Sequence, residues 1–258
     1  MASLALVVGG LTSGCGKTTV TLGLLRALAR AGHAVSAAKT GPDYIDNAFL
    51  AAASLSPSVN LDSHAMPDDM IRHLAAGRQG DLLIAEGVMG LFDGTDGGSG
   101  STAKLAAALG VPILLVLDAR HQGQTGAALA AGIRTQLPSG TDLAGVVLNR
   151  VASSRHGARI AEALSSLCIA DLGSLGVATW IRVPSRHLGL VQAADLAATD
   201  ELEPRIEAAA GLVTAALDLD AIIAAAGPLR AATGSITPPP PGQRIAMASD
   251  VGFGFAYT

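Results

Sequence analysis

Short runs of apolar residues recur along the chain and alternate with longer segments rich in alanine and leucine. The apolar runs cover residues 4–8, 34–38, 82–85, 113–117 and 145–148. Strands that are apolar at consecutive positions are buried on both faces, which is typical of a parallel sheet covered by helices on each side. The pattern therefore predicts the α/β class, with a mostly parallel sheet flanked by helices.

Helices are expected after Lys17, after Ser101, and over residues 127–135, 158–167 and 203–225. The last segment carries Glu207, Asp218 and Asp220. Acidic side chains indicate a helix that packs on the domain with one face in solvent, because a membrane-surface helix carries basic residues on its polar face.

The composition changes from Gly227 onward to proline and small residues, and four consecutive prolines at 238–241 favour an extended linker. An apolar strand with alternating aromatic residues follows. Because a single strand cannot bury its own faces, we expect a first domain over 1–226, a linker over 227–242, and over 243–258 the first strand of a truncated second domain. The alternative is a tail that folds back onto the first domain as an extra strand.

Composition and charge narrow the classes of function. The 258 residues are 50% hydrophobic and 15% charged, which suits a globular domain with a large core. The net charge of -4 offers no basic field for nucleic acid, and the apolar stretches are too short to span a membrane. The first apolar run lacks a preceding basic segment, so we expect a cytoplasmic protein without a signal peptide. Two cysteines and six scattered histidines show no spacing typical of a zinc site.

The stretch GGLTSGCGKTTV follows the first apolar run and has the features of a phosphate-binding loop. Gly16, Lys17 and Thr18 satisfy the end of the G-x-x-x-x-G-K-[ST] pattern, although Leu11 stands at its first glycine. Glycines let backbone N–H groups approach phosphate oxygens, and the following helix N-terminus attracts the same anion. Lys17 is expected at the β and γ phosphates, Thr18 at Mg²⁺ and Thr19 near the α phosphate.

A glycine-rich turn without a ligand is the alternative, but the position of the loop between a strand and a helix favours nucleotide binding. Cys15 is expected to be a small packing residue and not a nucleophile. The loop residues expected to contact the nucleotide are Thr12, Ser13, Gly14, Cys15, Gly16, Lys17, Thr18 and Thr19.

Two further stretches follow predicted strands, at the edge of the sheet where ligands collect. The first, KTGPDYIDNAFL, contains Lys39, Asp43 and Asp46. Either aspartate could instead cap a helix that begins near Ile45, and Lys39 could be a surface charge. Its neighbours favour contact with substrate or phosphate for Lys39.

The second stretch, EGVMGLFDGTDGGSGSTAKLA, begins with Glu86 and contains Asp93. An isolated carboxylate at the end of an apolar strand is costly to bury, so Glu86 is expected to serve function by binding Mg²⁺ directly or through water. Asp93 is expected to position the metal or an attacking amine. The six glycines that follow Glu86 in this stretch allow the backbone to approach a bulky anionic substrate.

The spacing of the phosphate loop is similar to that of dethiobiotin synthetase and the corrinoid amide synthases, and it lacks the second lysine of partitioning ATPases. Five further motifs occur in order: GPDYID, EGVMGLFDG, STAKLAAALGVPILLVLDA, GVVLNRV and PSRHLGLVQA. Together they make residues 4–194 resemble the ATP-binding half of the cobyrinic and hydrogenobyrinic acid a,c-diamide synthases. The resemblance implies a P-loop NTPase fold of the dethiobiotin synthetase type, followed in the family by a class I glutamine amidotransferase domain.

This resemblance implies an ATP-dependent amidation of the c and then the a acetate side chain of a corrinoid, through an acyl phosphate, with ammonia from glutamine or free ammonia. It implies ATP and Mg²⁺ as cofactors, with Mg²⁺ held by Thr18, Glu86 and either Asp43 or Asp46, of which Asp46 is preferred. Lys39 and Asp93 would face the acyl phosphate, which makes Lys17, Lys39, Asp43, Asp46, Glu86 and Asp93 the expected catalytic set.

The resemblance further implies that Asn149 reads adenine. Arg186 and His187 would either contribute to the site or form a loop salt bridge, and a homodimer is favoured by the open sheet edge. Three other readings remain open: cobyric acid synthase, a dethiobiotin synthetase-like enzyme, and a nucleotide-switch ATPase. The sequence leaves open whether the corrinoid contains cobalt.

Overall fold

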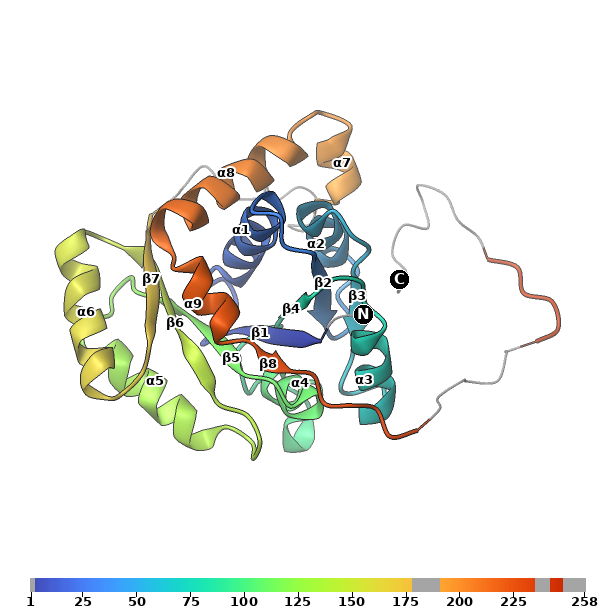
Figure 1. Ribbon diagram of the computed structural model, residues 1–258, viewed down its shortest axis with the longest axis horizontal. Helices are drawn as coiled ribbons and strands as arrows, with labels where there is room; N and C mark the ends of the chain where they lie inside the picture. The colour runs from blue at the N-terminus through green and yellow to red at the C-terminus, as the bar shows by residue number, and fades with distance from the viewer. Residues whose placement is uncertain (1–2, 178–190, 235–241, 248–258) are drawn as a thin grey trace.

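The computed structural model describes residues 3–177, 191–234 and 242–247 of the chain. In these ranges a single twisted sheet runs through the middle of the molecule with helices on both of its faces (Figure 1). The arrangement confirms the α/β class and the mostly parallel sheet expected from the sequence.

Among the described residues, seven strands lie parallel in the order β3-β2-β4-β1-β5-β6-β7, and the short β8 pairs antiparallel with β1. The five apolar runs of the sequence form β1, β2, β4, β5 and β6. The strands are β1 (Leu4–Gly10), β2 (Val35–Thr40), β3 (Val59–Leu61), β4 (Leu82–Glu86), β5 (Ile113–Asp118), β6 (Leu143–Val151), β7 (Asp171–Gly176) and β8 (Gly227–Pro228).

Two groups of helices cover the two faces of the sheet (Figure 1). On one face lie α1 (Lys17–Arg30), α2 (Asp46–Ser54), α7 (Ala193–Ala197), α8 (Leu202–Ala216) and α9 (Leu219–Ala224). On the other lie α3 (Asp68–Ala76), α4 (Thr102–Leu109), α5 (Thr125–Gln136) and α6 (Ser154–Ser166), and a 3-10 turn, η1 (Asp96–Gly98), precedes α4. No helix in these described ranges is long and apolar enough to cross a membrane.

The side chains of β1 alternate between the two covered faces of the sheet. Leu6 and Val8 pack against the helices of one face, whereas Ala5 and Val7 pack against those of the other, and all four are fully buried. Because successive side chains of a strand point to opposite faces, a strand with two covered faces is apolar at every position. The continuous apolar runs in the sequence have this origin.

The single helix expected over 203–225 is a wrong prediction, because the chain breaks there into α8 and α9. Leu217 leaves the helix and forms a bridge with Gly173 of β7. Asp218 then caps α9, with its side-chain oxygen accepting a hydrogen bond of 2.9 Å from the N–H of Ala221. A tertiary contact and a new cap thus outweigh the helical propensity of the segment.

The first residues of the expected linker pack against the first domain. Gly227 and Pro228 pair with Ala5 and Leu4, and the N–H of Arg230 donates to the carbonyl of Leu109 at 2.8 Å. Residues 242–247 form neither helix nor strand, and 235–241 and 248–258 lie outside the described residues. The domain boundary and the final strand therefore stay predictions.

A buried arginine joins three helices on the face that carries α1. Arg26 donates through Nε to the carbonyl of Ala53 at 3.2 Å and through Nη2 to that of Ala52 at 2.8 Å, at the end of α2. Its Nη1 contacts carboxylate oxygens of Glu203 at 2.6 Å and Glu207 at 2.5 Å, both on α8. This guanidinium fixes α2 and α8 relative to α1.

We expect Arg26→Met to lower the free energy of unfolding by about 2 kcal/mol, because several hydrogen bonds to a charged group are lost inside the protein. Arg30→Met is the matched control: Arg30 also contacts Glu207 from α1, but its side chain is 60% exposed. The control should cost less than about 1 kcal/mol. Urea denaturation measures both, and equal losses would contradict the role assigned to Arg26.

Candidate functional site

The phosphate-binding loop connects β1 to α1 and is shaped by two glycines in the left-handed region. Gly14 has φ 73° and Gly16 has φ 104°. Residues with a Cβ rarely adopt this conformation, and at Gly16 a Cβ would also collide with the side-chain amide of Asn149. The backbone therefore requires glycine at both positions, and at Gly16 the surroundings require it as well.

Lys17 lies at the start of α1 and its ammonium group is directed back over the loop. Its Nζ donates to the carbonyls of Met89 at 2.5 Å and Thr12 at 3.1 Å. Met89 belongs to the loop after β4 and has a left-handed φ of 49°. The loop after β4 is thereby connected to the phosphate loop through one lysine.

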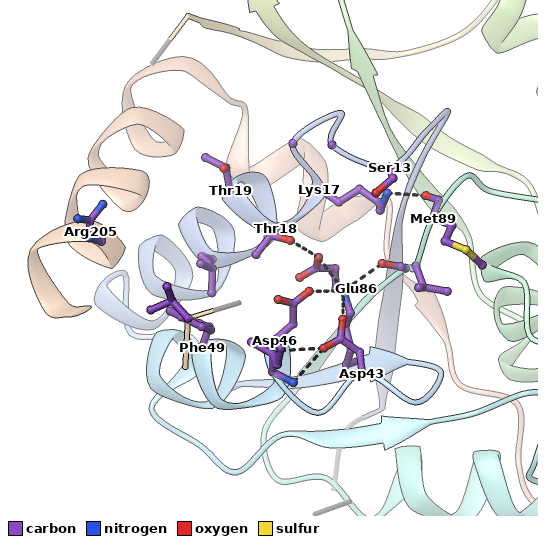
Figure 2. Close-up of a pocket in the computed structure, with 18 of the residues that line it drawn as sticks. Ser13, Lys17, Thr18, Thr19, Asp43, Asp46, Phe49, Glu86, Met89 and Arg205 are labelled. Carbon is purple, nitrogen blue, oxygen red and sulfur yellow. Dashed lines mark hydrogen bonds and ion pairs between the residues drawn. The ribbon is translucent and has the colours of Figure 1, made fainter. Parts of the chain in front are cut away.

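The carboxyl ends of β2 and β4 bring Lys39 and Glu86 together. The two residues are direct partners in the parallel ladder, and Lys39 Nζ lies 2.9 Å from Glu86 Oε1. Asp46, the first residue of α2, approaches the same ammonium group at 2.7 Å, and Thr18 donates to Glu86 Oε1 at 2.6 Å (Figure 2). Four of the predicted site residues thus form one polar cluster beside the phosphate loop.

Asp43 and Asp46 have different roles in this cluster. Asp43 Oδ1 accepts hydrogen bonds of 3.0 Å from the N–H groups of Ile45 and Asp46, so it closes the turn that begins α2. Its other oxygen lies 3.7 Å from Lys39 Nζ. Asp43 therefore holds the turn that leads into α2, although Ile45 is the N-cap of that helix, whereas Asp46 directs its carboxylate at the cluster.

The charges of the cluster shift one another's pKa values. Burial alone would lower the pKa of Lys39, but the three carboxylates around it outweigh this effect and raise its pKa above the ordinary value. Burial and the carboxylate of Glu86 raise the pKa of Asp46 to about 7, against the opposing effect of Lys39. Burial would also raise the pKa of Asp43, but Lys39 and the two backbone N–H groups lower it. Lys39 thus remains a permanent cation at neutral pH.

The oxygens of Thr18, Asp46 and Glu86 are of the type that Mg²⁺ prefers. Glu86 is fully buried, and its Oε2 is a buried oxygen without a hydrogen-bond partner in the part of the chain that the structure describes. A cluster of three or more histidine, cysteine, aspartate or glutamate side chains suited to hold a metal is absent from these same residues. Thr18, Asp46 and Glu86 supply oxygen donors only, which fits a magnesium ion that obtains its other ligands from water and phosphate.

A cavity of about 460 Å³ opens beside the phosphate loop and has two distinct ends. The polar end contains the loop and the Lys39 cluster, and the other end extends toward Phe49 and Arg205 (Figure 2). We call this second part the apolar end; it is lined by Leu22, Ile45, Phe49, Val191, Leu202 and Ile206, with Arg205 beside them. The cavity thus offers a charged surface for phosphates and an apolar surface next to it.

Ten of the predicted site residues line the cavity: Ser13, Gly14, Gly16, Lys17, Thr18, Thr19, Lys39, Asp43, Asp46 and Glu86. Asp93 is exposed and accepts a hydrogen bond of 2.8 Å from the N–H of Gly90 within its own turn. Asn149 is buried against the outer side of the phosphate loop. The roles of Asp93 toward the acyl phosphate and of Asn149 toward adenine stay predictions, and Arg186 and His187 lie outside the described residues.

Several residues of the site were missed by the sequence reasoning. Arg150 lines the cavity next to the predicted Asn149, and a charged residue at the end of an apolar strand was a usable signal. Arg205, Leu202 and Ile206 come from the first turns of α8, about 185 residues after the phosphate loop, and only packing against α1 brings them to the cavity. No local pattern marks them.

Comparison with known proteins finds a nucleotide-binding family over the part of the chain that contains the phosphate loop. Residues 6–187 match the family model described as CobQ/CobB/MinD/ParA nucleotide binding domain. Among solved structures, chloroplast FtsY from Physcomitrella patens is 18% identical with a TM-score of 0.48, covering 69% of this chain and 60% of that one, which is too distant to bear on function.

Curated relatives are much more similar. The chain is 44% identical over 264 residues to "Hydrogenobyrinate a,c-diamide synthase" of Mesorhizobium japonicum, covering 100% of the chain and 59% of that protein. It is 46% identical over 257 residues to the protein of the same name from Rhodobacter capsulatus, covering 98% and 58%. The resemblance expected from the motifs is confirmed, and the chain spans about three fifths of the length of these relatives.

The raised pKa of Asp46 predicts how stability depends on pH in the presence of a chelator. A carboxyl group whose pKa is about 7 in the folded protein and about 4 in the unfolded chain stabilises the fold at low pH, and this contribution is lost as the pH rises through 7. The effect of Asp43 has the opposite sign and lies below about pH 4, because its pKa is lowered.

Urea denaturation of the parent chain and of Asp46→Asn between about pH 5 and pH 8 tests this expectation. The free energy of unfolding of the parent should fall relative to that of the variant over this interval. A difference that stays constant with pH, or that grows, would show that Asp46 is already ionised at the low end.

Proposed function

Because the chain belongs to the CobQ/CobB/MinD/ParA nucleotide binding domain family, we propose that it binds ATP at the phosphate loop and uses it to activate a corrinoid carboxylate for amidation. The observation that carries the proposal is the cluster of Lys39, Glu86 and Asp46 beside Thr18, at the carboxyl ends of β2 and β4. The names of the curated relatives support hydrogenobyrinate as the substrate class and its a and c carboxylates as the reacting groups.

The reaction proposed has two chemical steps. A carboxylate oxygen of the substrate attacks the γ-phosphorus of ATP, the bond to the β-phosphate oxygen breaks, and an acyl phosphate and ADP result. Ammonia then attacks the acyl carbon, inorganic phosphate leaves, and the nitrogen gives up its extra proton, which leaves the amide. Ammonia is supplied free or from glutamine.

The loop residues stabilise negative charge during the first step. Lys17 exchanges the carbonyls of Met89 and Thr12 for oxygens of the β and γ phosphates, and the N–H groups around Gly14 and Gly16 contact the same phosphates. Thr19 also lines the cavity, where it would contact the α phosphate. These groups are fixed before the reaction, so they need no costly reorganisation when charge develops.

Thr18, Asp46 and Glu86 would hold the magnesium ion. When bound, Mg²⁺ supplies charge neutralisation for the transferring phosphoryl group. Glu86 offers its second oxygen, which has no partner among the described residues. Asp43 fixes the backbone that carries Asp46, so it contributes through position.

Lys39 is permanently charged and is unsuited to act as a base. Three acceptors already surround its ammonium group: Glu86 at 2.9 Å, Asp46 at 2.7 Å and the carbonyl of Gly87 at 3.3 Å. It keeps two neighbouring carboxylates from repelling each other and fixes their orientation. Contact with the acyl phosphate requires one of these acceptors to be exchanged.

The test is amide formation by the 258-residue chain with ATP, Mg²⁺ and an ammonium salt, with and without hydrogenobyrinic acid, followed by mass spectrometry. We expect two successive conversions of carboxylate to amide that require ATP. Glu86→Gln should reduce the rate by about 100-fold, the effect typical of removing one preorganised charge from an active site. The matched control is Glu162→Gln, which changes an exposed glutamate of α6 on the opposite face of the sheet.

Absence of any amide in the parent chain under these conditions would overturn the proposal for this chain. ATP hydrolysis that proceeds without a corrinoid, and that is unchanged when one is added, would favour a nucleotide-switch ATPase instead. Equal rates in Glu86→Gln and Glu162→Gln would show that the polar cluster is not the reaction centre.

A further inference from the structure

Two consecutive residues at the end of β6 contact the outer side of the phosphate loop. Asn149 donates through its Nδ2 to the carbonyl of Cys15 at 2.8 Å, and Arg150 donates through Nη1 to the carbonyl of Gly14 at 2.8 Å. The loop carbonyls that they bind are also consecutive. Each of these contacts joins segments more than 130 residues apart in the sequence.

The backbone at Arg150 makes this double contact feasible. Successive side chains of a strand point to opposite faces, so Asn149 and Arg150 would ordinarily diverge. Arg150 instead has a left-handed φ of 60°, an unfavourable conformation for a residue with a side chain. Local strain of this type concentrates at functional sites, where the surroundings maintain it.

The geometry of the loop explains why its outer carbonyls matter. Gly14 and Gly16 are left-handed and Cys15 between them is not, an alternation that turns successive N–H groups toward a common concave side. Side chains that hold the carbonyls of Gly14 and Cys15 therefore leave the N–H groups available to an anion. Besides these contacts, the loop is restrained by Lys17, which donates to the carbonyl of Thr12 at 3.1 Å, and by the buried side chain of Cys15.

Asp118 completes the arrangement from the neighbouring strand. It is the direct partner of Asn149 in the β5–β6 ladder, and its Oδ2 lies 2.5 Å from Nη1 of Arg150. Arg120 contacts the same oxygen at 2.8 Å. Asp118 thus directs the guanidinium of Arg150 at the loop. We refer to Asp118, Asn149 and Arg150 as the loop clamp.

We propose that the loop clamp holds the phosphate loop in its anion-binding shape before the nucleotide arrives, so that these three positioning residues determine affinity for the triphosphate and not for the base. The inference rests on the proposed nucleotide binding. Its physical basis is preorganisation: a loop that is already ordered loses less conformational entropy when its ligand binds. The competing role for Asn149 is recognition of adenine.

Two probes separate these roles: ATP, and inorganic tripolyphosphate, which has no base. Calorimetric titration of the 258-residue chain should give about tenfold weaker binding of both probes for Asn149→Ala and for Arg150→Ala. Each variant loses one hydrogen bond to a carbonyl of the phosphate loop, and a loss of this size is expected for one such bond. Arg150→Lys should recover part of the affinity, because an ammonium group still reaches the carbonyl of Gly14.

The control variant is Arg134→Ala. Arg134 is also half-buried and also donates to two backbone carbonyls, those of Cys168 at 2.9 Å and Leu167 at 3.1 Å, but it lies on α5 away from the loop. It should leave both affinities unchanged. Hydrogen exchange of the amides of residues 13–17 without ligand should accelerate in Arg150→Ala and not in Arg134→Ala.

Asp118→Asn distinguishes the clamp from a simple charge effect. Removal of a negative charge near an anion site strengthens anion binding if Arg150 acts only through its charge. The clamp predicts the opposite result, weaker binding of both probes, because Arg150 is no longer directed at Gly14.

The outcomes separate this inference from the proposed function. A parent chain that binds neither probe contradicts nucleotide binding itself, and the clamp with it. A parent that binds both, together with equal affinities for Arg150→Ala and Arg134→Ala, overturns the clamp alone. Loss of ATP affinity in Asn149→Ala with unchanged tripolyphosphate affinity assigns Asn149 to the base and removes it from the clamp.

Discussion

The buried ammonium group of Lys39 is the interaction on which the rest of the candidate site depends. It lies at the end of a central strand, 3% exposed, with carboxylates from β4 and α2 around it. Glu86 is fully buried, and its carboxylate would be strongly destabilising there without a cation beside it. The ladder between β2 and β4 fixes Lys39 beside Glu86. The carboxylate of Asp46 then connects the first turn of α2 to Lys39.

The parallel sheet determines where the residues of the candidate site lie. A parallel sheet places all strand ends at one edge, so loops that follow β1, β2 and β4 meet there. The phosphate loop supplies N–H groups and Lys17, and the neighbouring strands supply Lys39 and Glu86. The helices of one face then decide the shape of the cavity, since α2 and α8 contribute its apolar end and Arg26 connects both helices to α1.

The family match covers most of the candidate site but not all of it. The family model covers residues 6–187, which include the phosphate loop and the polar cluster. The apolar end of the cavity also uses Val191, Leu202 and Ile206, which lie beyond that match. The alignment with one curated relative extends over this part as well, since it covers 100% of the chain at 44% overall identity.

The sequence by itself determined the fold class, the phosphate loop and the four members of the polar cluster. These features are encoded locally: runs of apolar residues mark strands, GKTT marks the start of the first helix, and Lys39 and Glu86 stand where strands end. The tertiary structure decided which aspartate lies closer to Lys39, where the helix after residue 202 breaks, and which residues form the apolar end. It also decided that Arg150 contacts Gly14, 136 positions away. Local patterns report how a residue interacts with its neighbours along the chain, whereas these contacts depend on how strands and helices pack, which no short stretch contains.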